Sequence, residues 1–208
     1  MRSGSRWCFL LVAIVVLAGP SLGWAGPPTD QLRTQIDHVV KILDDQELKK
    51  ESRALDRRKA VRKIADEIFD FAETAKRSLG RHWQARSPAE REEFVQLFAD
   101  LLERSYISKI ELYSGERITY LNDSIEGDQA AVRTKLVTKQ GTEVPVDYRM
   151  LKKGDRWLVY DVIIEGVSLV ANYRTQFNKI IQTASYQDLV KKMKTKQEEF
   201  LEQEKKRT

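Results

Sequence analysis

The 208-residue sequence has a single cysteine, Cys8, and two histidines, His38 and His82. One cysteine can form neither a disulfide within the chain nor a cysteine-based metal site. Neither histidine has a second histidine or a cysteine at the spacing that zinc sites use, so we expect no metal ion. The sequence also lacks a glycine-rich phosphate loop, a nucleophile elbow and a dinucleotide fingerprint, and it therefore predicts no cofactor.

Long hydrophobic runs are also missing. The only one, Trp7–Ala18, has 12 residues, which is short of the roughly 20 that a membrane-spanning helix needs. It follows two arginines and precedes the small residues Gly23 and Ala25, a pattern typical of a secretory signal. We expect residues 1–25 to be a signal peptide that is cleaved after Ala25, which implies export. The alternative is an uncleaved N-terminal anchor.

The composition excludes a disordered chain and argues against nucleic-acid binding. Hydrophobic residues make up 41% of the sequence and charged residues 32%, which is enough for one ordinary core. The formal net charge of +5 is modest, and the basic residues are spread along predicted helices without interleaved aromatic residues.

The densest basic cluster lies between Lys49 and Lys63, where eight Lys or Arg residues accompany two acidic residues. Such a surface can dock on acidic lipid headgroups or on an acidic partner protein. On this interpretation Arg57, Arg58 and Lys59 are the docking residues. The alternative is an ordinary solvated helix face.

Residues 26–113 have the periodicity of amphipathic helices. One apolar stripe runs from Leu32 to Leu43, and another extends along a long helix after Ser87. Ser87 and Glu90 have the spacing of a capping box, which marks the start of that helix. A shorter helix before it is predicted to end at Gly80.

Residues 116–165 change to the alternating pattern of strands. Segments 130–137 and 144–151 each place apolar residues on one face, and a weaker strand is predicted over Arg117–Leu121. Segment 157–164 is apolar on both faces apart from Asp161, which is typical of a central strand covered on both sides. Glycine-containing turns between the segments indicate an antiparallel meander.

Helical periodicity returns over residues 167–194, and a charged tail is expected over residues 195–208. The order of helices, strands and helices predicts an α+β fold, in which helices cover an antiparallel sheet. We expect residues 26–194 to form one domain.

Two side chains are candidates for catalysis. Asp161 lies in a very apolar strand, where a buried carboxylate can act as a base, and His82 follows a helix end. Asp161 can equally cap a neighbouring helix or meet an arginine, and Ser168 is better explained as a helix N-cap than as a nucleophile. We expect no enzyme. The alternative is a small isomerase- or dehydratase-type pocket that uses Asp161 or His82.

Apolar surface is what the sequence has in abundance. The predicted helices carry wide stripes that are rich in aromatic residues. These residues form either a solid core or the wall of a cavity for an apolar ligand between the sheet and the helices.

Three sequence blocks carry a resemblance to a known family. Residues 157–177 include WLVYDV followed by EGVSLVANYRTQF, residues 79–83 are LGRHW, and residues 87–94 are SPAEREEF. In order and spacing these blocks resemble the MlaC family, also called the toluene-tolerance or organic-solvent-resistance transporter auxiliary family. The first two helices and the segment after Met193 match the family only in character.

The resemblance implies a phospholipid carrier in a Gram-negative periplasm. Such a carrier shuttles glycerophospholipid between an outer-membrane lipoprotein complex and an inner-membrane ABC transporter with an MCE-domain subunit, and so maintains outer-membrane lipid asymmetry. The implied fold is a curved antiparallel sheet of the nuclear-transport-factor-like kind with a helical subdomain. The remaining alternative is a periplasmic adaptor with a solid core and no lipid.

Two acyl chains with about 30 methylenes represent roughly 24 kcal/mol of apolar exposure in water, at about 0.8 kcal/mol each. A carrier must replace most of that water with an apolar wall, and about half of the candidate residues are expected to contact lipid. The candidates are Phe94, Leu97, Phe98 and Leu101 of the long helix, Val132, Val146, Tyr148 and Trp157 of the strands, and Val167, Val170, Tyr173 and Phe177 of the following segment.

Overall fold

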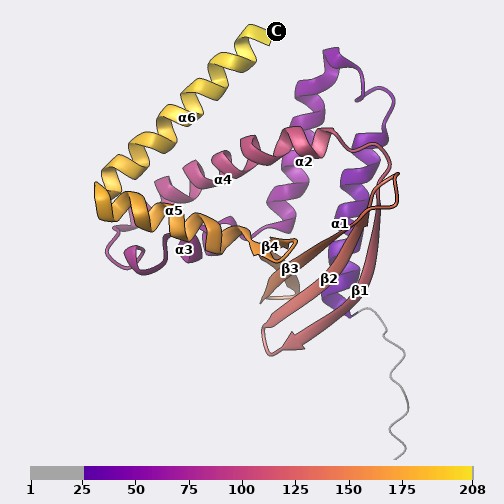
Figure 1. The fold of residues 1–208 in the computed structure, drawn as a ribbon, viewed down its shortest axis with the longest axis horizontal. Coiled ribbons are helices and arrows are strands. Elements are labelled where there is room, and N and C mark those ends of the chain that lie inside the picture. Colours follow the sequence, from indigo (N-terminus) through magenta and orange to yellow (C-terminus); the bar gives the residue numbers. More distant parts are fainter. Residues whose placement is uncertain (1–25, 208) are drawn as a thin grey trace, which may run out of the picture.

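The computed structural model describes residues 26–207, and the expected signal peptide over residues 1–25 lies outside them. Within the described part, no helix combines the length and the apolar character needed to cross a membrane. An antiparallel five-stranded sheet lies beside helices that precede and follow it in the chain (Figure 1), which confirms the predicted α+β class. In chain order the elements are α1 (Pro27–Asp44), η1 (Glu51–Arg53), α2 (Ala54–Ile68), α3 (Phe71–Leu79), η2 (Gly80–His82), α4 (Pro88–Glu111), β1 (Arg117–Glu126), β2 (Gln129–Val137), β3 (Glu143–Lys153), β4 (Arg156–Ile164), β5 (Val167–Ser168), α5 (Leu169–Thr183) and α6 (Tyr186–Arg207).

The sheet is a meander in the order β1-β2-β3-β4-β5, and two β-bulges interrupt its alternation. The register of β1 skips Leu121, and the register of β4 skips Tyr160. A bulge adds one residue and changes which face the following side chains occupy. As a result Asp123 pairs across the sheet with Val132, and Val162 pairs with Tyr148.

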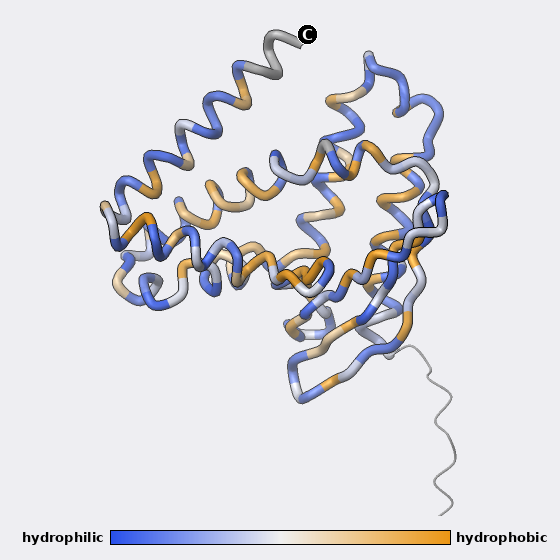
Figure 2. Tube along the Cα trace, in the orientation of Figure 1, coloured by the Kyte–Doolittle hydropathy of each residue, from blue (hydrophilic) through white to orange (hydrophobic). Residues whose placement is uncertain are grey.

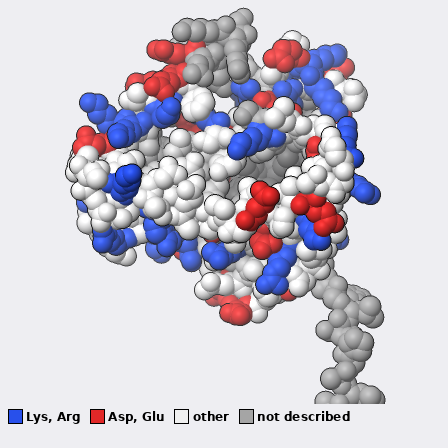
Figure 3. Space-filling view, viewed as in Figure 1, with Lys and Arg blue, Asp and Glu red and all other residues white. Residues whose placement is uncertain are grey.

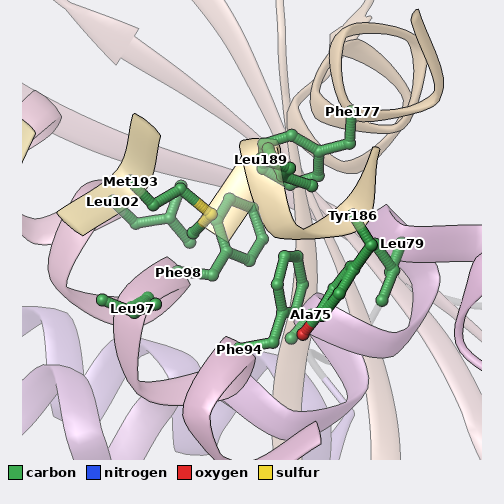
Figure 4. Close-up of a cluster of buried hydrophobic side chains, with 10 residues drawn as sticks. All are labelled: Ala75, Leu79, Phe94, Leu97, Phe98, Leu102, Phe177, Tyr186, Leu189 and Met193. Carbon is green, nitrogen blue, oxygen red and sulfur yellow. The ribbon is translucent and has the colours of Figure 1, made fainter. Parts of the chain in front are cut away.

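The apolar side chains gather in two separate clusters. The helical core lies between α3, α4, α5 and α6, and its side chains point toward one another (Figure 4). Its rings are in contact, since the ring centroid of Phe98 lies 5.2 Å from that of Phe177 and 5.0 Å from that of Tyr173. The sheet core lies between α1, α2 and the inner face of the sheet, and it contains Leu32, Ile68, Ala130, Val132, Met150, Trp157 and Val159.

Strand β4 has helices or loops along most of its outer edge. Only two of its residues pair with the short strand β5. Farther along the same strand, the Gln31 side chain bonds the backbone N and O of Trp157 at 2.9 and 2.8 Å, and the N–H of Asp70 donates to the O of Val159 at 2.9 Å. Strand β4 lies between β3 and β5 and contacts α1, α2, α3 and α5. Its apolar character on both faces therefore reflects cover on both sides, as predicted, although β5 pairs with only two of its residues.

The C-terminal segment differs from expectation, because residues 195–208 were predicted to be a charged tail. Helix α6 instead continues to Arg207. Its sequence is rich in good helix formers, and Lys196 pairs with Glu199 one turn later. The helix also contacts α4, where the Arg104 guanidinium lies 5.8 Å from the Phe200 ring centroid. Figure 2 shows that α6 is largely hydrophilic along its length.

Asp161 joins the sheet to α5. Its side chain is 2% exposed, and its Oδ1 accepts the backbone N–H of Val170 at 3.0 Å. Its Oδ2 accepts the hydroxyl of Ser168 at 2.7 Å and Nη1 of Arg149 at 3.3 Å. The Ser168 hydroxyl in turn accepts the N–H of Ala171, so it caps α5 as predicted.

We expect Asp161→Ala to lower the free energy of unfolding by about 2–3 kcal/mol, because three donors lose a charged acceptor. Ser168→Ala removes one hydroxyl cap and should cost about 1 kcal/mol. Urea unfolding followed by circular dichroism measures both values. Equal costs for the two variants would show that Asp161 does not hold the sheet to α5.

Candidate functional site

Only one half of the inner face of the sheet is covered. At the covered half, Ala130, Val132, Met150 and Val159 are buried against α1 and α2 in the sheet core. Helices α4, α5 and α6 do not extend this cover, because they pack mainly on one another and on α3. The other half of the inner face extends beyond this cover, and Tyr120, Tyr148 and Val162 at its border pack against the sheet core.

This second half, called here the open half, is apolar and contiguous. The strand register pairs Leu136 with Val144, Val146 with Ile164 and Tyr148 with Val162 on the same face. All of these residues are half-buried except Ile164, which is 39% exposed. Figure 3 shows a hollow on one face of the molecule, with both charged and uncharged side chains around it.

Two tyrosine hydroxyls lie on this face, beside the buried hydroxyl of Thr134, which donates to the O of Val146 at 2.6 Å. Tyr148 is only half-buried, yet burial raises the pKa of its hydroxyl to about 12. Burial also raises the pKa of Tyr120, with the nearby Tyr148 and Asp37 adding to the effect and Arg33 opposing it, and the Tyr120 hydroxyl has no hydrogen-bond partner. Both hydroxyls stay neutral at pH 7, and the Arg33 guanidinium of α1 lies 4.6 Å from the centroid of the Tyr120 ring.

The C-terminal half of α4 carries further apolar side chains, of which Tyr106 packs against the helical core. Tyr106 and Ile107 are half-buried, and Ile110 and Leu112 are exposed. Burial raises the pKa of Tyr106, and the nearby Tyr173 of α5 adds to the shift. By contrast, the N-terminal half of α4 supplies Phe94 and Phe98 to the helical core.

The structure separates the twelve predicted wall residues instead of gathering them around one cavity. Phe94, Leu97, Phe98 and Phe177 are buried in the helical core, and Leu101 and Tyr173 are half-buried against it. Val132 and Trp157 are buried in the sheet core, and Val170 is buried at the start of α5. Val146 and Tyr148 lie on the open half, whereas Val167 is 62% exposed on β5.

Sequence reasoning did not select five residues of the open half: Ile118, Leu136, Val144, Val162 and Ile164. Alternation already put Leu136 and Val144 on one face of their strands. Nothing in the alternation indicates which end of that face the helices cover, so covered and open positions had the same pattern.

The proposed docking residues differ in their surroundings. Arg57 donates to the O of Leu48 at 2.7 Å and to Oε1 of Glu111 at 2.9 Å, and Arg58 bonds both carboxylate oxygens of Glu111. Lys59 is exposed and borders a groove of about 260 Å³ between α2 and α4. Two of the three residues therefore hold α2 against the end of α4.

Glu111 is the acceptor at the centre of this contact. Burial raises the pKa of its carboxyl, but hydrogen bonds from Arg58 and Arg57 outweigh burial and hold the pKa below its ordinary value of 4.5. A lowered folded-state pKa stabilises the fold above the ordinary pKa, and that stabilisation is lost as the pH falls through the folded-state pKa.

Glu111→Gln should therefore lower the free energy of unfolding at pH 7 by about 1–3 kcal/mol, because two arginines lose a charged acceptor. The difference from the unchanged protein should shrink as the pH falls below 4.5. Urea unfolding from pH 7 to pH 3 measures it. A difference that is constant with pH would contradict the role of the charged carboxylate.

The two catalytic candidates are engaged in structural contacts. Asp161 accepts the three hydrogen bonds described above, and His82 Nε2 lies 3.0 Å from Oδ1 of Asn178 on α5. Across residues 26–207, no group of three or more His, Cys, Asp or Glu side chains is arranged to hold a metal ion.

Comparisons with known proteins agree on one family. The profile of the family described as MlaC protein matches residues 33–195. A Haemophilus influenzae protein named "Intermembrane phospholipid transport system binding protein MlaC" is 26% identical over 120 residues, which are 55% of this chain and 56% of that protein. The matched region thus spans about half the length of this relative.

A solved structure has a similar fold. It is the phospholipid-binding protein from Ralstonia solanacearum, determined in complex with a phospholipid. The two structures superpose with a TM-score of 0.73 over 84% of this chain and 98% of that one, at 23% sequence identity. At this level of identity the likeness establishes the shared fold.

Proposed function

Because this chain belongs to the MlaC family, we propose that it binds a glycerophospholipid and carries it between membranes. The name of the Haemophilus influenzae relative and the phospholipid in the Ralstonia solanacearum structure support this proposal. The function would be binding and transport, with no catalysis, in line with the structural contacts of Asp161 and His82.

The observation that carries the proposal is the open half of the sheet. An apolar face inside a fold, left without helix cover, costs free energy in water, at roughly 25 cal/mol for each Å². Acyl chains are the ligand class that removes this cost, since they bury apolar surface and need no directional partner. The neutral hydroxyls of Tyr120 and Tyr148 would donate hydrogen bonds to the ester oxygens of the lipid.

The proposed lipid wall is narrower than the predicted one. It includes Val146 and Tyr148 of the open half, together with Leu101 and Tyr173 at the rim of the helical core. The other members are the half-buried or exposed residues Ile118, Leu136, Val144, Val162 and Ile164. The buried predicted residues would form the packed core behind this wall, and Val167, which is 62% exposed, belongs to neither group.

We also propose the wider setting that the family implies. The chain would be exported after loss of residues 1–25, and residues 26–207 would form one lipid-binding domain in the periplasm. Its partners would be an outer-membrane lipoprotein complex and an inner-membrane ABC transporter with an MCE-domain subunit. On the basic surface of α2, Lys59 is the member of the predicted docking trio that is exposed for such a contact.

Val146→Glu should abolish lipid retention in protein that remains folded, because an unpaired carboxylate would lie against acyl chains. The protein is purified from the periplasm without added lipid and examined by native mass spectrometry. The unchanged protein should carry a species with the mass of a phospholipid, and the variant should show the mass of the chain alone.

Leu151→Glu is the matched control. Leu151 is a half-buried apolar residue of the same strand, and the register puts it on the opposite face of the sheet. This variant should keep its lipid. Lipid retained by folded Val146→Glu would exclude the open half as the site, and absence of lipid from the unchanged protein would contradict the carrier function itself.

A further inference from the structure

Asp123 is a carboxylate on the apolar inner face of the sheet. The bulge at Leu121 turns it inward, opposite the fully buried Val132. Its Oδ2 accepts the hydroxyl of Thr29 at 2.7 Å and the backbone N–H of Gly26 at 2.8 Å. Both donors are neutral in an uncleaved chain, and among the described residues Asp123 forms no ion pair with Lys or Arg. A carboxylate in such surroundings is better stabilised by a cation than by neutral donors.

Gly26 fits closely against this carboxylate. It is the N-cap of α1, followed by Pro27 in the first turn. A Cβ atom at position 26 would lie 2.7 Å from Oδ2 and 3.0 Å from Oδ1 of Asp123, so a side chain there would displace the carboxylate from this position. The Gly26 backbone therefore lies against both oxygens of the carboxylate, and glycine is the residue that permits this approach.

Gly26 is also the residue at which the mature chain is expected to begin. Cleavage after Ala25 would replace the Gly26 amide with an α-amino group, whose ordinary pKa of about 8 makes it positively charged at pH 7. The single N–H donor toward Asp123 would become an ammonium group with three donors.

We propose that Asp123 is a binding site for the α-ammonium group of Gly26, which signal-peptide cleavage creates. The site rests on the predicted cleavage position and is independent of lipid binding. An ammonium group alone is unfavourable at the N-terminus of a helix, where the helix dipole is positive. The Asp123 carboxylate reverses this effect, so processing strengthens the attachment of α1 to β1.

The test compares four proteins at pH 7. All begin at Gly26, with a free or an acetylated α-amino group, and each form carries either Asp123 or the substitution Asp123→Asn. Acetylation should lower the Tm of the Asp123 protein by about 2–4 °C, the shift expected for the loss of about one charged hydrogen bond in a chain of this size. It should not lower the Tm of Asp123→Asn.

Glu126→Gln is the matched control, because it removes a carboxylate from the exposed end of the same strand. Acetylation should lower its Tm as in the unchanged protein. Should Asp123→Asn fail to fold, NMR titration of the Gly26 amine in the unchanged protein replaces that arm. A pKa above about 8 is expected, because a neighbouring carboxylate favours the charged amine.

Three results would overturn the proposal: an equal effect of acetylation with and without Asp123, an α-amine pKa at or below about 8, or an exported protein whose intact mass places its first residue elsewhere than Gly26. None of these measurements reads lipid content. A protein that carries no lipid can therefore still show the interaction of Gly26 with Asp123, and a lipid carrier can lack it.

Discussion

The fold depends on strand β4, which contributes Val159 to the sheet core and is hydrogen-bonded to α5 through Asp161. In a regular strand, residues two apart point to the same face, so Val159 and Asp161 would both enter the sheet core. The extra residue Tyr160 prevents this, and it sends Asp161 toward α5 while Val159 stays inside. Without the bulge, a carboxylate would be buried without its donors, at a cost of several kcal/mol. With it, the same strand completes the sheet core and holds the first turn of α5.

This division explains how the fold tolerates an apolar surface without helix cover. The helical core packs Phe94, Phe98 and Phe177 with no contribution from the open half, so its stability does not require that the sheet be fully covered. Helices α1 and α2 close one end of the inner face and stop there. The open half is then a consequence of where the helices are attached. On the proposed function, a ligand that covers it would replace water and leave the protein core unchanged.

Much of the fold is predictable from the sequence, because local signals agree with it. Ser87 and Glu90 form the expected capping box, and the alternation in β2 and β3 identifies their inner faces. The predicted strand over Arg117–Leu121 stopped where the bulge begins, since the extra residue reverses the alternation that defines a strand. The helical structure of the segment after Met193 is not predicted, because few apolar residues mark a helix there. Its helix-forming residues and ion pairs are nevertheless enough to continue α6. The wall residues could not be chosen, because covered Val132 and open Val146 have identical patterns and differ only in tertiary cover.

The tyrosines of the open half have a consequence for the conditions under which the protein works. With a hydroxyl pKa of about 12, Tyr148 does not ionise in mildly alkaline surroundings, and acid does not change it either. The aliphatic side chains and tyrosine hydroxyls of the open half carry no charge of their own over the range in which histidines and carboxylates titrate. On the proposed function, the affinity of these side chains for acyl chains would then not depend on pH.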